Sequence, residues 1–93
     1  MRVTFKLGEP LWRSVGKREV AVEAAAPATV GDALVALGAA YPQAGEELQG
    51  RGGRSDFYYS LFVNDRLVLF AQKDQAQVKD GDTISILLPL AGG

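Results

Sequence analysis

The residues that could carry chemistry stand at the end of the chain, where Gly92 and Gly93 follow the apolar and small residues 86–91. Neither glycine has a side chain, so the reactive group is expected to be the terminal carboxylate of Gly93. A chain end without Cβ atoms can adopt any backbone angle and fit a narrow channel. That property suits a carboxylate delivered into another protein's active site. Small residues are also common in ordinary disordered termini.

The side chains that usually perform catalysis are absent, because the 93 residues include no cysteine and no histidine. Thiolate nucleophiles, imidazole bases and the commonest zinc ligands are thereby excluded. We expect no metal site and no enzymatic activity, but rather a co-substrate on which an enzyme acts. The net charge of −1, from 10 basic and 11 acidic residues, argues against nucleic-acid binding.

The chain shows no sign of membrane association or secretion. Its longest apolar run, residues 86–90, is far too short to cross a membrane. The first residues, MRVTFKLGEP, lack the apolar stretch of a signal peptide. We therefore expect a cytoplasmic location.

Alternating apolar and polar residues predict a first pair of strands at 2–7 and 19–24, joined by a long loop. Trp12 in that loop is interpreted either as an interface anchor or as a cover for one end of the core. The last strands are predicted at 57–63, 66–70 and 83–88, with a turn at Asp80-Gly81-Asp82 before the final one.

The one convincing helix is predicted between the two groups of strands. Thr29 and Asp32 have the spacing of a capping box, and Pro42 is expected to stop the helix. A polar, glycine-rich stretch follows, with at most one helical turn at 46–49. The apolar stripe of the helix consists of Val30, Ala33, Leu34, Leu37 and Tyr41.

This order of elements predicts an α+β fold of the β-grasp (ubiquitin-like) type. It has a mixed four- to five-stranded sheet, covered on one face by one main helix. The last strand should lie beside the first and parallel to it. We expect one domain at residues 1–88 and a flexible tail at 89–93. Pro89 has no N–H and should end the strand pairing, and the tail could then span roughly 17 Å when extended.

The strand alternation also predicts a docking surface. If Ile84 and Ile86 face the helix, Leu87 points outward, and Phe62 does the same on the neighbouring strand. Exposed apolar patches of this kind often mark interfaces, although Phe62 could simply pack against a cross-strand neighbour. The predicted partner-binding residues are Phe62, Leu87, Leu88, Pro89, Leu90 and Ala91, and the predicted reacting residues are Gly92 and Gly93.

Three segments carry a resemblance to a known family. The segment KDGDTISILLPLAGG resembles the C-terminal signature of the MoaD/ThiS ubiquitin-like sulfur carriers, with its DGD turn, hydrophobic strand, proline and Gly-Gly. LFVND is similar to their third strand and turn, and ATVGDALVALGAAYP is similar to their helix. Together these segments extend the resemblance to nearly the whole chain.

The resemblance implies a carrier that is acted on by partners and that binds no cofactor itself. A ubiquitin-activating-like adenylating enzyme would use ATP and magnesium to adenylate Gly93. A sulfur donor would then form a thiocarboxylate, which passes its sulfur to a synthase subunit. The protein could thus be the small subunit of a sulfurtransferase such as molybdopterin synthase.

The resemblance favours molybdopterin biosynthesis as the destination of the sulfur, but other destinations stay open. Many molybdopterin-type members have Pro-Pro where this chain has Leu88-Pro89. The alternatives are carriers for cysteine, thiamine or tRNA thiolation, and ubiquitin-like modifiers of lysines. A non-covalent β-grasp binding module is a further alternative.

Overall fold

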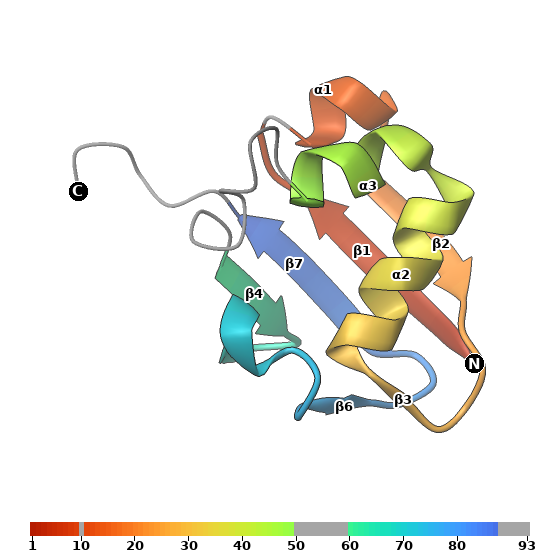
Figure 1. Cartoon of the computed structure of the whole chain (residues 1–93), viewed down its shortest axis with the longest axis vertical. Coiled ribbons are helices and arrows are strands. Elements are labelled where there is room, and N and C mark those ends of the chain that lie inside the picture. Colours follow the sequence, from red (N-terminus) through yellow and green to blue (C-terminus); the bar gives the residue numbers. More distant parts are fainter. Residues whose placement is uncertain (10, 50–59, 88–93) are drawn as a thin grey trace.

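The computed structural model describes residues 1–9, 11–49 and 60–87. Within them, five strands form one mixed sheet in the order β2-β1-β7-β4-β5 (Figure 1). β7 is central, parallel to β1 and antiparallel to β4, which confirms the predicted β-grasp sheet. The strands are β1 (Arg2–Leu7), β2 (Glu19–Glu23), β4 (Ser60–Val63), β5 (Arg66–Leu69) and β7 (Thr83–Leu87).

The main helix, α2 (Val30–Ala40), begins at the predicted capping box. The Asp32 backbone N–H donates to Thr29 Oγ1 at 3.1 Å, and the Thr29 N–H donates to Asp32 Oδ2 at 3.0 Å. Two otherwise unsatisfied donors are paired in this way. The predicted stripe faces the core, although its last member, Tyr41, is only half-buried and forms the C-cap.

A second helix, α3 (Pro42–Gln49), follows directly and corrects the expectation of a polar stretch with one helical turn. Pro42 does end α2, but it also begins α3, because the first helical position needs no N–H donor. Ala44 and Leu48 of α3 are buried. Gly38 and Gly45 let the two helices touch, since a Cβ at Gly38 would lie 3.3 Å from the Gly45 Cα.

Four short elements were not predicted. A one-turn helix, α1 (Leu11–Val15), occupies the expected loop and buries Leu11 completely. β3 (Ala28–Thr29) pairs with β6 (Gln77–Val78), and a 3₁₀ turn, η2 (Phe70–Gln72), follows β5. Elements of two to five residues contain too few positions to show a period.

The core lies between the sheet and the helices α2 and α3, which cover one face (Figure 1). Phe5, Leu37, Leu61, Ile84 and Ile86 are completely inaccessible to solvent. No described helix covers the opposite face, which we call the open face. Among the described residues, no helix has the length and apolarity needed to span a membrane.

Candidate functional site

The predicted site begins where β7 ends. The strand is held on both sides, by Leu7 of β1 opposite Ile86 and by Ser60 of β4 opposite Leu87. It is therefore a fixed base for whatever follows Leu87. The predicted site residues Leu88, Pro89, Leu90, Ala91, Gly92 and Gly93 lie outside the described residues, as does the predicted domain boundary.

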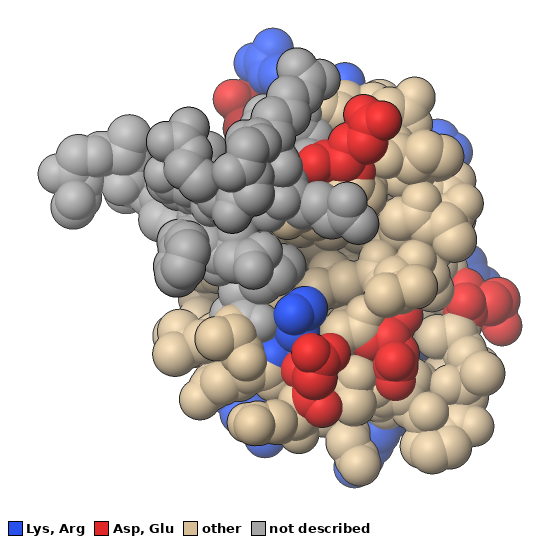
Figure 2. All heavy atoms as spheres, viewed as in Figure 1, with Lys and Arg blue, Asp and Glu red and all other residues tan. Residues whose placement is uncertain are grey.

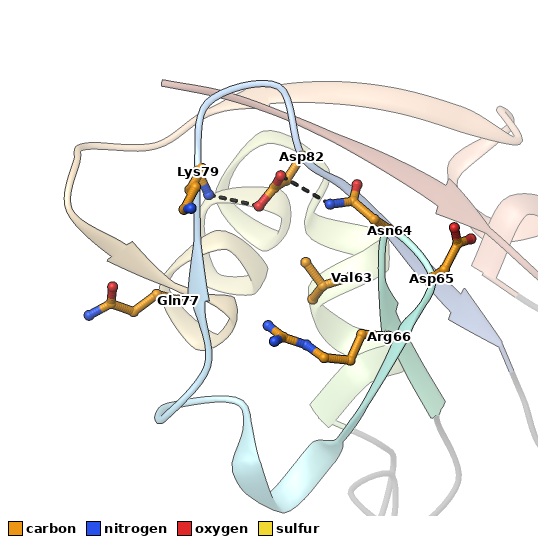
Figure 3. A pocket seen from close by; sticks show the side chains of 7 residues that line it. All are labelled: Val63, Asn64, Asp65, Arg66, Gln77, Lys79 and Asp82. Atoms are coloured by element: carbon orange, nitrogen blue, oxygen red, sulfur yellow. Dashed lines mark hydrogen bonds between the residues drawn. The ribbon is translucent and has the colours of Figure 1, made fainter.

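The DGD turn clamps the opposite end of β7. Asp80 Oδ1 accepts from the Arg2 backbone N–H at 2.6 Å. Asp82 accepts from the Lys79 backbone N–H at 2.8 Å and from the Asn64 side chain at 3.2 Å (Figure 3). Gly81 takes the left-handed conformation, with φ of 88°, which glycine adopts without cost. Both carboxylates are thus used to fix β7 against β1 and the β4–β5 turn.

Both predicted docking residues lie on the open face. Leu87 is 44% exposed, and Phe62 is half-buried between the buried residues Leu61 and Val63. Phe62 therefore points away from the helices, as predicted. Its cross-strand neighbours are Ser85 of β7 and Leu67 of β5.

The structure adds two residues that the sequence reasoning missed, Leu67 at 51% exposure and Leu69 at 53%. Between them Val68 is buried, so the alternation in β5 places both leucines on the open face. The register sets Leu69 and Leu87 on either side of Ser60. We call Phe62, Leu67, Leu69 and Leu87 the apolar patch. The alternation RLVLF was the available signal, but only the sheet order shows that β5 extends the same face.

The other part of the open face, on β1 and β2, is charged. The register places Arg2 opposite Glu23 and Lys6 opposite Glu19, and all four side chains are exposed. Oppositely charged neighbours across a strand pair are mildly stabilising. We call these four residues the charged half of the open face.

α1 is attached to the same end of β7 as the tail. The Gly8 N–H donates to the Ile86 carbonyl at 2.9 Å, and the Trp12 N–H donates to the Gly8 carbonyl at 3.1 Å. A Cβ at Gly8 would approach the Ile86 carbonyl oxygen to 3.0 Å and Leu87 Cδ2 to 3.2 Å, so a side chain at this position would require its neighbours to shift.

Trp12 packs against the core and remains partly exposed, which agrees with the predicted cover for one end of the core, while the interface role stays a prediction. The guanidinium groups of Arg13 and Arg18 lie 5.0 and 4.4 Å from the centre of its ring, within the range of cation–π attraction. Arg13 Nη2 also pairs with Glu9 Oε1 at 3.1 Å. Hydrogen bonding and charge from Arg13 lower the pKa of Glu9, with smaller contributions from Trp12 and Arg18.

A polar hollow of about 540 Å³ lies at the far end of β7 (Figure 3). Its lining includes Asn64, Arg66, Gln77 and Lys79, and Arg66 reaches across it from β5. No group of three or more Asp, Glu, His or Cys gathers as a metal-binding set among the described residues. The hollow lies at the opposite end of β7 from Leu87.

Comparison with known proteins identifies relatives of the whole chain. The ThiS family model matches residues 9–93. The structure of SAMP1 from Haloferax volcanii is similar over 100% of both chains, with 28% identity and a TM-score of 0.83. A chain of the BexX/CysO complex from Amycolatopsis orientalis is 30% identical over 98% of this chain and 99% of that one, with a TM-score of 0.69.

CysO from Mycobacterium tuberculosis is 26% identical over 95% of this chain and 99% of that one, with a TM-score of 0.73. No curated protein matches the chain. The fold and the open face define a ubiquitin-like protein of the β-grasp class. The chain belongs to the ThiS family, whose members are small sulfur carriers and modifiers rather than enzymes.

Proposed function

We propose that this protein carries sulfur as a thiocarboxylate on Gly93. The observation that carries the proposal is the family match, which runs through the Gly-Gly end of the chain. The apolar patch supports it, because exposed apolar side chains, Leu87 among them, gather near the end of β7, after which residues 88–93 follow in the sequence. A carrier needs both features, a reacting end and a surface by which partners recognise it.

The chemistry requires an activating partner, because a free carboxylate is a poor electrophile. An adenylating enzyme with ATP and magnesium lets a Gly93 carboxylate oxygen attack the α-phosphate, and pyrophosphate leaves. A hydrosulfide-level sulfur donor then attacks the acyl carbon and AMP leaves, so that C–S replaces C–O. The chain itself, with neither cysteine nor histidine, supplies the substrate group and not the catalytic groups.

The apolar patch is the proposed docking surface for the adenylating enzyme and for the sulfur acceptor. Complete burial of one leucine or phenylalanine side chain contributes about 1.5–3 kcal/mol. Three of the four patch residues are about half exposed, so much of that free energy is still available to a partner. Leu88, Pro89, Leu90 and Ala91 are proposed to continue the contact into the partner's channel.

For the destination of the sulfur, we propose molybdopterin biosynthesis, one of the pathways served by the MoaD/ThiS carriers that the DGD-to-Gly-Gly segment resembles, although Leu88 stands where many molybdopterin-type members have proline. Cysteine biosynthesis is the second candidate. It is favoured by the 30% identity, over nearly the whole of both chains, to a chain of the BexX/CysO complex. A modifier of lysines would use the same adenylation step. It would differ from the carriers of both sulfur pathways in its product, which is a conjugate to a lysine of another protein.

The decisive experiment is mass spectrometry of the intact chain after incubation with its adenylating enzyme, ATP, magnesium and sulfide. We expect the mass change of one oxygen-to-sulfur exchange, located on Gly93. Its matched control is a chain lacking Gly92 and Gly93, which should keep the wild-type circular dichroism spectrum and gain no sulfur. A wild-type chain that binds the enzyme yet never gains sulfur would refute the proposal.

The destination is tested with the thiocarboxylated protein and isolated acceptors. Loss of its sulfur to a molybdopterin synthase large subunit with its substrate, and not to a cysteine synthase, is expected. The reverse preference would assign the protein to the second candidate pathway. Conjugates to lysines of other proteins, lost when the carboxyl end is extended, would instead identify a modifier.

A further inference from the structure

Two basic side chains, Arg13 and Arg18, lie over the Trp12 ring, and Lys17 precedes Arg18 in the sequence. Residues 11–18 contain Arg13, Lys17 and Arg18 and no acidic residue, although the whole chain has a net charge of −1. By contrast, residues 24–49, which include the two helices over the sheet, contain three acidic residues and no lysine or arginine. Figure 2 shows lysine and arginine side chains at the top of the view, over the position of α1 in Figure 1. We call Trp12, Arg13, Lys17 and Arg18 the basic cluster.

The cluster is fixed in position beside the base of the tail. The bond from the Gly8 N–H to the Ile86 carbonyl ties the start of α1 to the end of β7. The close approach of Gly8 to Leu87 continues that contact into the apolar patch. A partner that covers Leu87 and receives the tail would therefore also meet α1.

The guanidinium groups are held before any partner arrives. Arg13 and Arg18 both lie over the Trp12 ring, and Glu9 holds Arg13 from a second direction. Ordering long side chains is one of the costs of association, and this arrangement reduces that cost. Tryptophan and arginine are also the residue types most enriched among side chains that dominate binding energies.

The position of the cluster indicates which part of the partner it meets. Residues 88–93 would span on the order of 20 Å when extended, so the nucleotide that reacts at Gly93 would be remote from α1. The cluster would face the rim of the partner's channel rather than its phosphates. Guanidinium groups in that place select carboxylates, with which arginine forms paired hydrogen bonds.

We propose that the basic cluster is a second docking surface, which binds aspartate and glutamate side chains at the rim of the adenylating enzyme's tail channel. The proposal rests on the proposed function and names a recognition element of that same site. The apolar patch supplies burial, while the cluster orients the chain so that the tail points into the channel. Complementary charges of this kind also speed encounter and make it dependent on salt.

The test is the affinity of the full chain for its adenylating enzyme, measured by calorimetry at low and at high ionic strength. The variant R13E/R18E places like charges against the acidic rim and should bind at least about tenfold more weakly at low salt. Because salt screens the attraction in the wild type but the repulsion in the variant, the affinity should fall with added salt in the wild type and should not fall in the variant. The matched control is R66E/K79E, which makes the same change of charge in the hollow at the far end of β7 and should bind like the wild type.

Thermal unfolding of both variants shows whether they fold. If R13E/R18E does not, R13Q/R18Q removes the charges without reversing them and should show a smaller loss in the same direction. Equal affinity of the wild type and the cluster variant, or an equal loss in R66E/K79E, would overturn the proposal. In that case sulfur gain by the wild type would leave the proposed function standing. A wild type that gains no sulfur would overturn both.

Discussion

The two parts of the open face follow the same alternation but expose different chemistry. On β1 and β2 the outward residues other than Thr4 and Ala21 are charged and stand opposite residues of the other sign, as with Lys6 and Glu19. On β7, β4 and β5 they are mainly apolar, and Leu67, Leu69 and Leu87 are about half exposed. The charged side chains are paired across the strands and exposed to water, whereas the apolar patch has no covering element among the residues that the structure describes.

This difference favours the apolar patch, rather than the charged half, as the proposed binding surface. The fold needs only the inward residues, and both parts bury theirs, such as Val3 and Phe5 on β1 and Leu61 and Val63 on β4. Outward leucines add little to folding and favour association. Their exposure near the end of β7 therefore supports the proposed role in recognition.

The largest loss of stability should come from a substitution of Ile86, which lies on β7, the strand between the two parts of the open face. Ile86 is completely buried, so Ile86→Ala should lower the free energy of unfolding by about 2–5 kcal/mol through lost burial and a cavity. The matched variant is Leu87→Ala on the other side of the same strand, which should leave stability nearly unchanged. Urea unfolding measures both, and similar losses would show that Leu87 also belongs to the core.

The second prediction compares the apolar patch and the charged half by their contribution to the affinity for the adenylating enzyme. L69E/L87E puts charges into the apolar patch, and we expect the affinity for the adenylating enzyme to fall by at least about a hundredfold, since hot-spot losses exceed 2 kcal/mol each. The control K6A/E19A removes one opposed pair from the charged half and should bind like the wild type. Calorimetric titration gives both values. A loss confined to K6A/E19A would reverse the assignment.

A smaller loss of stability is expected when two like charges are placed opposite each other in the charged half. Lys6→Glu sets two acidic residues opposite each other, which should cost about 0.2–1 kcal/mol of stability. Adding Glu19→Lys restores opposite signs in the reverse order and should recover most of the loss. Thermal unfolding of the single and double variants tests this double-mutant cycle. No recovery would mean that these residues act independently.

The smallest effect concerns Glu9, an exposed carboxylate outside both parts of the open face. Arg13 lowers the pKa of Glu9, so their ion pair stabilises the fold above the ordinary carboxyl pKa. That contribution is lost as the pH falls through the lowered value. Glu9→Gln should therefore be slightly less stable than the wild type at neutral pH and equal to it in acid. A difference that grew on acidification would contradict this sign.

The sequence was most informative where a pattern repeats over several residues. The alternation in β1, β2 and β7 and the capping box at Thr29 predicted the sheet and α2 before any coordinates. It also placed Phe62 and Leu87 on the open face. The prediction failed at α3, where Pro42 was interpreted only as the end of a helix and not as the beginning of the next.

The sequence by itself determined which residues of each strand share a face and which residue types stand at the ends of the strand. Both depend only on residues that are neighbours along the chain. The sequence could not determine which strands lie side by side. The tertiary structure alone brings Leu67 and Leu69 beside Leu87 and sets α1 against the end of β7. These contacts join residues far apart in the chain, and they follow from sheet order and register, which the packing of the whole core decides.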